Sequence, residues 1–144
     1  MPGEKLTADE QRYADVIAVA SRANFTFAES QCLGTSIVRK FGLARAKKLD
    51  FAEEVDNTPP MGQADAEKAV EALEACVNLA EYVIRAAQKN LGLTDAQIGP
   101  CALLLDQAKV RAFFVKSSMT NTTDPGALES LQADLASALP RCKI

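Results

Sequence analysis

The chain has 144 residues, of which 48% are hydrophobic and 24% are charged, and its formal net charge is −3 at pH 7. This length and composition predict one globular domain, and they exclude a disordered chain and a strongly basic nucleic-acid-binding protein. The sequence contains no histidine, so the commonest general base and the commonest metal ligand are both missing. We therefore expect a protein that is not an enzyme, with no catalytic residues, no metal and no cofactor.

Membrane and export signals are absent from the sequence pattern. No apolar run approaches the roughly 18 residues that a membrane span needs, so we expect a protein that does not span a membrane. The residues from Met1 to Lys5 are polar and lack the hydrophobic core of a signal peptide. Either the protein stays where it is made, or the chain is the mature region of an exported protein behind a new Met.

Capping boxes mark the first helices. The pattern Thr-x-x-Glu occurs at 7–10 and again at 26–29, and it predicts helices over about 8–22 and 27–41. We expect Gly42 to end the second of these helices with backbone angles in the left-handed region. The spacing of apolar residues is helical again from 43 to 55.

The clearest loop of the chain covers residues 57–62, which include two prolines and a glycine. A helix over about 64–90 should follow, because apolar residues recur there in alternating steps of three and four. Such a helix would be about 39 Å long. We expect this long central helix to be shared by two similar helical units.

Three more segments read as helices. A third capping box at 94–97 predicts a helix start, and residues 103–117 are helical in pattern with a bend near Asp106. After a polar loop, an Asp–Pro pair predicts a last helix that begins at Pro125, and Pro140 helps to end it. The expected fold class is all-α, a compact bundle of six or seven helices.

A weak internal similarity runs through the chain. Tyr13 and Cys32 are separated by 19 positions, as are Tyr82 and Cys101, and each cysteine follows a threonine-led helix start. Chance could produce so few matches, and a duplication is the alternative. The single domain, 1–144, would then consist of an internal repeat of about 8–76 and 77–142.

Four cysteines allow three pairings. Two equivalent units favour Cys32 with Cys76 and Cys101 with Cys142, and the chain-entropy contribution of each bridge is on the order of 4 kcal/mol. The alternative is four buried free thiols, which are common in cytosolic proteins. Bridged cysteines would favour an extracytoplasmic or other oxidising compartment.

Four stretches with cysteines also carry a family resemblance: Phe-Ala-Glu-Ser-Gln-Cys at 27–32, then 74–79, 93–101 and 139–142. They look like a cysteine-paired, all-helical module of exported actinobacterial proteins, and they cover about half the chain. Members of that group are largely without assigned activity. The resemblance therefore implies export and disulfide bridges rather than a reaction.

Two groups of charged residues invite a functional interpretation. A basic cluster could meet an anionic partner, and its alternative is a solvated face. It consists of Arg39, Lys40, Arg45, Lys47 and Lys48. The carboxylates of Glu67, Glu71 and Glu74 share one helical face, which we expect to be solvated rather than to hold a metal.

Six of the eight aromatic side chains could line an apolar pocket between the two helical halves, or they could be the bulky part of an Ala/Leu core. They are Tyr13, Phe25, Phe27, Tyr82, Phe113 and Phe114. The function we expect is that of a non-catalytic helical interaction protein: an accessory subunit, an inhibitor or a binding partner in a larger assembly. The alternative is a carrier of a small apolar ligand or lipid. We expect a protein partner and no nucleic acid.

Overall fold

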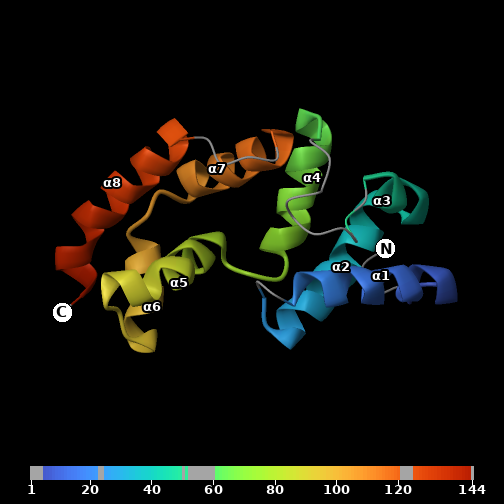
Figure 1. The fold of residues 1–144 in the computed structure, drawn as a ribbon, viewed down its shortest axis with the longest axis horizontal. Coiled ribbons are helices and arrows are strands. Elements are labelled where there is room, and N and C mark those ends of the chain that lie inside the picture. Colours follow the sequence, from blue (N-terminus) through green and yellow to red (C-terminus); the bar gives the residue numbers. More distant parts are fainter. Residues whose placement is uncertain (1–4, 23–24, 50, 52–60, 121–124, 144) are drawn as a thin grey trace.

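The computed structural model describes residues 5–22, 25–49, 51, 61–120 and 125–143, and this part of the chain forms eight helices and no strands. The all-α fold class is thus confirmed, with more helices than predicted. The helices are α1 (Ala8–Ser21), α2 (Phe27–Phe41), α3 (Leu43–Leu49), α4 (Gln63–Glu74), α5 (Leu79–Leu91), α6 (Asp95–Leu103), α7 (Gln107–Thr120) and α8 (Pro125–Cys142) (Figure 1).

The capping boxes expected at the starts of α1 and α2 are present. In α2, the Thr26 hydroxyl accepts a hydrogen bond from the Glu29 N–H at 3.1 Å, and the Thr26 N–H donates to the Glu29 carboxylate at 3.0 Å. Each box satisfies two backbone N–H groups that the helix itself leaves unpaired. Gly42 follows α2 with φ of 80°, and Gly92 ends α5 in the left-handed region.

The long helix predicted over 64–90 is wrong, because the chain breaks it into α4 and α5. The cause is Asn78, which has extended backbone angles and whose side-chain oxygen accepts a hydrogen bond from the Glu81 N–H at 2.9 Å. An asparagine in this role caps a new helix rather than continuing the old one. The turn between the two helices also carries Cys76, which is covalently tied to α2.

The helix predicted over 103–117 is also interrupted, because Leu103 ends α6 and α7 begins at Gln107. Asp106 accepts a hydrogen bond from the Lys109 N–H at 3.2 Å and so begins α7 as a cap, where we predicted only a bend. The prediction that Pro140 helps to end α8 is also wrong, since the helix continues to Cys142. Only Arg141 and Cys142 follow this proline in α8, so its missing N–H affects just the last turn of the helix.

Several sequence predictions fall outside the described residues. These are the last part of the helix over 43–55, most of the loop at 57–62, and the cap at Asp124.

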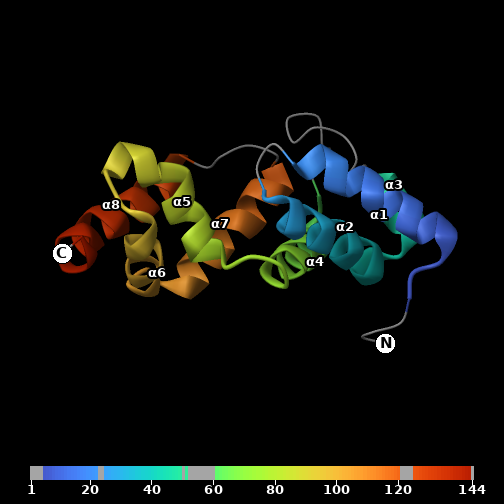
Figure 2. The ribbon, with the colours of Figure 1, turned by 90° about the horizontal axis from the view of Figure 1, so that it is seen from below.

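The helices form two groups that follow one another along the long axis of the molecule. Helices α1 to α3 occupy one end, while α5, α6 and α8 occupy the other (Figures 1 and 2). One apolar cluster, which includes Ile17, Leu33 and Val38, lies in the first group. A larger cluster, which includes Ile84 of α5 and Val110 of α7, extends from α4 through the second group.

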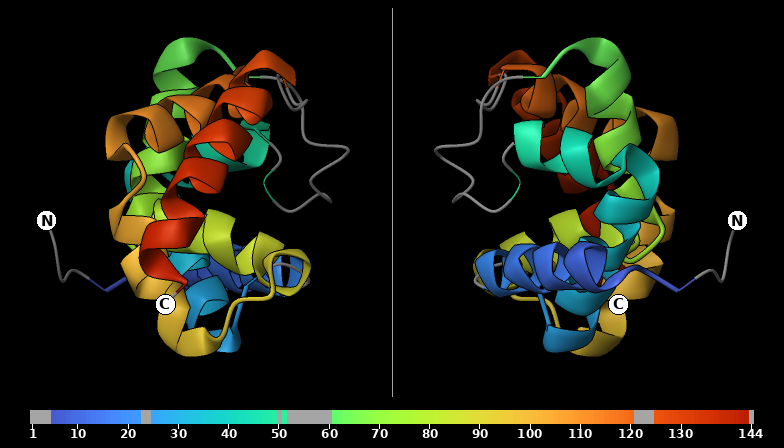
Figure 3. Two further views of the ribbon diagram at one scale, coloured as in Figure 1. Left: turned by 90° about the vertical axis from the view of Figure 1, so that its left-hand side faces the viewer. Right: turned by 90° about the vertical axis from the view of Figure 1, so that its right-hand side faces the viewer.

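Helix α4 connects the two groups, because it packs against α2 on one side and α7 on the other. Its buried Ala72 belongs to the first cluster, whereas Ala66 and Val70 belong to the second. The end views show α3, α4 and α7 on one side of the molecule and α1 and α5 on the other (Figure 3). The shared central element is therefore α4 alone, half as long as the predicted helix.

No helix in the described part of the chain is both long enough and apolar enough to cross a bilayer.

Candidate interaction groove

A groove of about 920 Å³ runs along α2. Its walls come from the segment before α1, from α1 and α2, and from the turn after α4. The lining residues are Lys5, Leu6, Glu10, Gln31, Cys32, Thr35, Ser36, Val38, Arg39, Lys40, Gly42 and Ala75. We call this the α2 groove.

The α2 groove carries excess positive charge. Lys5, Arg39 and Lys40 contribute three cations, and Glu10 contributes the single carboxylate. The Glu10 carboxylate accepts a hydrogen bond from the Thr7 backbone N–H at 2.9 Å, and this bond lowers the pKa of Glu10. The lining is thus cationic in a chain whose net charge is −3, so the groove would attract acidic groups selectively.

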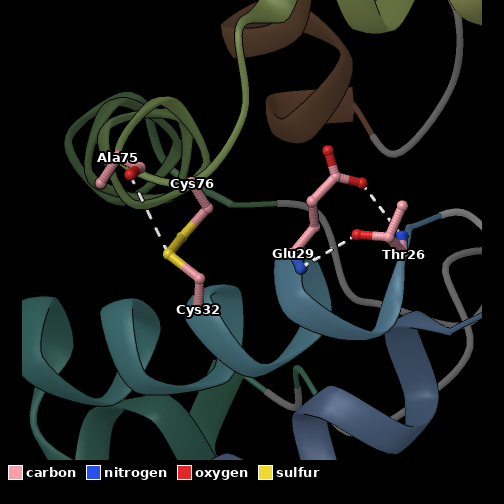
Figure 4. Close-up of a disulfide and its surroundings, with 5 residues drawn as sticks. All are labelled: Thr26, Glu29, Cys32, Ala75 and Cys76. Carbon is pink, nitrogen blue, oxygen red and sulfur yellow. Dashed lines mark hydrogen bonds between the residues drawn. A yellow bond between two sulfur atoms is a disulfide. The ribbon is translucent and has the colours of Figure 1, made fainter.

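A disulfide forms part of the groove wall. Cys32 on α2 is bonded to Cys76, their Cα atoms are 5.6 Å apart, and the Cys32 side chain is exposed (Figure 4). The second disulfide joins Cys101 on α6 to Cys142 at the end of α8. This is the pairing that the internal similarity predicts: one bond connects α2 to the turn after α4, and the other connects α6 to the end of α8.

The residues of the predicted basic cluster have different neighbours. Lys40 makes an ion pair with Glu71 on α4 at 2.7 Å, and Arg45 on α3 pairs with Asp65, also on α4. The Lys47 ammonium lies over the ring of Tyr13, 5.8 Å from its centroid. Arg39 and Lys40 line the groove, whereas Arg45, Lys47 and Lys48 do not.

Two of the three carboxylates expected on a solvated face of α4, Glu71 and Glu74, are exposed and also pair with cations of neighbouring helices. Glu71 lies between Lys40 on α2 and Arg111 on α7, and the hydrogen bond and charge of Lys40 lower the pKa of Glu71. Arg111 also pairs with Glu74 at 2.7 Å. Both glutamates stay about half exposed, so each pair adds little stability but orients α4 between its neighbours.

Four of the six aromatic residues that were predicted to line a pocket meet where the two helix groups join. The ring of Tyr82 stacks on Phe25 with centroids 5.1 Å apart, and its other neighbour is Phe114 at 6.0 Å. Phe113 and Phe114 pack edge to face at 5.7 Å. Burial, and then the nearby charge of Glu29, raise the pKa of Tyr82.

The other two aromatic residues lie apart from this cluster. The Tyr13 hydroxyl donates to the Ala46 carbonyl at 3.3 Å and so links α1 to α3. Phe27 is 65% exposed at the start of α2, and the Arg22 guanidinium lies 5.1 Å from its ring centroid. The structure thus brings together four of the predicted pocket residues and separates two.

Two smaller hollows accompany the α2 groove. One, of about 280 Å³, lies beside the break between α4 and α5 and is lined in part by Asn78 and Arg111. The other, of about 270 Å³, lies between α7 and α8 and includes Asp106 and Asp134. None of the three hollows is lined by an aromatic side chain.

Sequence reasoning missed the groove, although a signal was present. Cys32, Ser36 and Arg39 recur at helical spacing, so they share one face of α2. That face is more polar than the buried stripe through Leu33 and Ile37. In the described residues, no three Cys, Asp or Glu side chains gather as metal ligands would.

Comparisons with protein-family models, with curated proteins and with solved structures gave no match for this chain.

Proposed function

We propose that this chain is a non-catalytic interaction protein that binds an acidic segment of a protein partner in the α2 groove. The observation that carries the proposal is the lining of the groove, in which Lys5, Arg39 and Lys40 outnumber the hydrogen-bonded Glu10, even with Lys40 paired to Glu71 on α4. Complementary charge of this kind guides a partner to the site and disfavours partners of the same sign.

The shape and chemistry of the groove favour a peptide segment over a small ion. Leu6, Val38 and Ala75 supply apolar surface beside the cations, so an acidic segment with interspersed apolar residues would match both. A volume of about 920 Å³ exceeds the space that one small anion fills. The disulfide fixes one wall to α2, which reduces the ordering that binding would otherwise require.

The same proposal includes an oxidising, extracytoplasmic compartment. Two disulfides support it, because such bonds persist where thiols are not kept reduced. The resemblance to exported cysteine-paired modules points the same way.

Fluorescence anisotropy with a labelled peptide of alternating glutamate and leucine would test the groove. We expect the oxidised chain to bind this peptide, to bind a lysine–leucine peptide poorly, and to lose affinity as salt is raised. Arg39→Glu should weaken binding by about tenfold or more. Lys48→Glu is the matched control, because it also replaces a positive charge by a negative one, at a residue that does not line the groove.

Circular dichroism would show that both variants keep their helices. Equal binding of the two peptides by the wild type, or equal loss in the two variants, would contradict the proposal.

A further inference from the structure

The two disulfides of this chain lie in opposite environments. Cys101 is 0% exposed and Cys142 is 8% exposed, so their bond is buried among α6 and α8. Cys32 is exposed and Cys76 is half-buried, and Cys32 lines the α2 groove. Exposed disulfides exchange with external thiols more readily than buried ones, because the attacking thiolate must reach a sulfur atom.

We infer that the Cys32–Cys76 bond is a redox-sensitive element that controls the α2 groove, a role that rests on the proposed function. A dithiol supplies the two electrons. Its thiolate attacks Sγ of Cys32, the bond between the two protein sulfurs breaks, and Cys76 leaves as a thiolate that takes up a proton. The second thiol of the reagent then displaces Cys32 as a thiol, and the reagent becomes a disulfide.

The charges of the groove favour this exchange. Arg39 and Lys40 line the same hollow as Cys32, so an approaching thiolate meets positive charge. Glu10 is the one carboxylate in the lining, and it is held in the capping box with Thr7. None of the three hollows described above is lined by Cys101, whose side chain is fully buried.

The reduced state is accommodated locally. Sγ of Cys32 lies 3.9 Å from the carbonyl oxygen of Ala75, a contact in which a free thiol can donate a weak hydrogen bond (Figure 4). Helix α4 stays attached through the Lys40–Glu71 pair and through its buried Ala72. Reduction therefore frees the turn that follows α4 without detaching the helix.

The freed turn changes the groove, because Ala75 belongs to its wall. In the oxidised chain the bond at Cys76 holds Ala75 against α2. In the reduced chain Val77 stays buried and the turn keeps its backbone hydrogen bonds to α4, but the covalent bond that fixes Ala75 relative to α2 is gone, so this part of the wall is less restrained. Binding of an acidic segment should then weaken by about fivefold or more, since a loosened wall must be ordered again on binding.

Reduction mapping on the wild-type chain tests the first step. The oxidised protein is incubated with dithiothreitol, samples are alkylated over time, and peptide mass spectrometry locates the label. We expect Cys32 and Cys76 to be labelled at least about tenfold faster than Cys101 and Cys142. Labelling of all four at one rate, or of Cys101 and Cys142 first, would overturn the inference.

Anisotropy with the glutamate–leucine peptide tests the second step, before and after dithiothreitol has opened only the first bond. A weaker complex after reduction, with unchanged helical circular dichroism, is the expected result. Equal binding in both states would overturn the redox control and leave the groove function intact. No binding even by the oxidised chain would refute the groove function and the control with it, while the order of labelling would stand as a separate result.

Discussion

Gly34 of α2 lies directly against the backbone carbonyl of Ala14 in α1, with no space for a side chain between the two helices. A Cβ built on Gly34 would overlap this carbonyl group, and backbone cannot move aside as a flexible side chain can. The fully buried Ser30, one turn earlier, continues the same strip of small residues. The absence of a side chain at Gly34 thus lets α1 and α2 pack closely.

We predict that Gly34→Ala lowers the free energy of unfolding by about 2–3 kcal/mol, because the added methyl group pushes two packed helices apart. The matched control is Gly99→Ala in α6, where the nearest atom to a built Cβ is a Glu81 carboxylate oxygen at 3.7 Å. That control should be neutral or stabilising by up to about 1 kcal/mol, because alanine has a higher helix propensity than glycine. Urea unfolding followed by circular dichroism measures both, and equal midpoints for the two variants would contradict the close packing.

The break between α4 and α5 gives a second prediction. Asn78→Ala removes the side-chain oxygen that caps α5 at the Glu81 N–H, so we expect a loss of about 1 kcal/mol. Asn90→Ala, an exposed change near the other end of α5, should have almost no effect. If the two variants unfold at the same urea concentration as the wild type, Asn78 does not act as a cap.

Tyr82 gives a prediction about pH. Because burial raises the pKa of Tyr82 above its ordinary value of 10.0, the tyrosine should ionise later than a solvated one when the pH is raised. The protein has two tyrosines, so the absorbance titration of Tyr82→Phe records Tyr13 alone, and the difference from wild type isolates Tyr82.

The sign of the effect on stability follows from the same shift. The folded state holds the Tyr82 proton more tightly than the unfolded state, so this contribution is complete below pH 10 and is lost as the pH rises through the raised pKa. Wild type should therefore lose more stability than Tyr82→Phe between neutral and strongly alkaline pH. A midpoint for Tyr82 at or below 10 would contradict the burial of its hydroxyl.

Removal of each disulfide provides the fourth prediction. The bonds span 44 and 41 residues, so chain entropy alone predicts nearly equal losses, on the order of 4 kcal/mol each. Cys101→Ala/Cys142→Ala also leaves a void in the buried core, whereas Cys32→Ala/Cys76→Ala changes an exposed groove wall. We expect the former variant to have the lower melting temperature in thermal denaturation, and the opposite order would contradict the difference in burial.

The helical class and most helix starts could be predicted because they depend on local signals. Thr7 and Thr26 act through hydrogen bonds to residues three positions away, and the sequence displays both partners. The break at Asn78 was missed because the apolar period continues across it, so the pattern of a long helix outweighed a single capping residue. Asn78 followed by Glu81 was the signal that could have located the new helix start.

The candidate site was harder to predict because it depends on which helices meet. Arg39 and Lys40 follow one another in sequence with Arg45 and Lys47 close by, yet only the first two line the groove. The others are directed elsewhere by partners that are distant in sequence, such as Asp65 on α4 for Arg45. Likewise, Phe25 finds Tyr82 only through the packing of the two helix groups.

The Cys32–Cys76 bond also has a consequence for synthesis. Its second cysteine is at position 76 of 144, so α1 to α4 can form and be covalently closed before the second half of the chain has been made. Until α7 arrives, however, the side of α4 that carries Ala66 and Val70 has no cover. A nascent chain would thus have an oxidised amino-terminal half with one apolar strip in need of temporary protection until α7 is made and covers it.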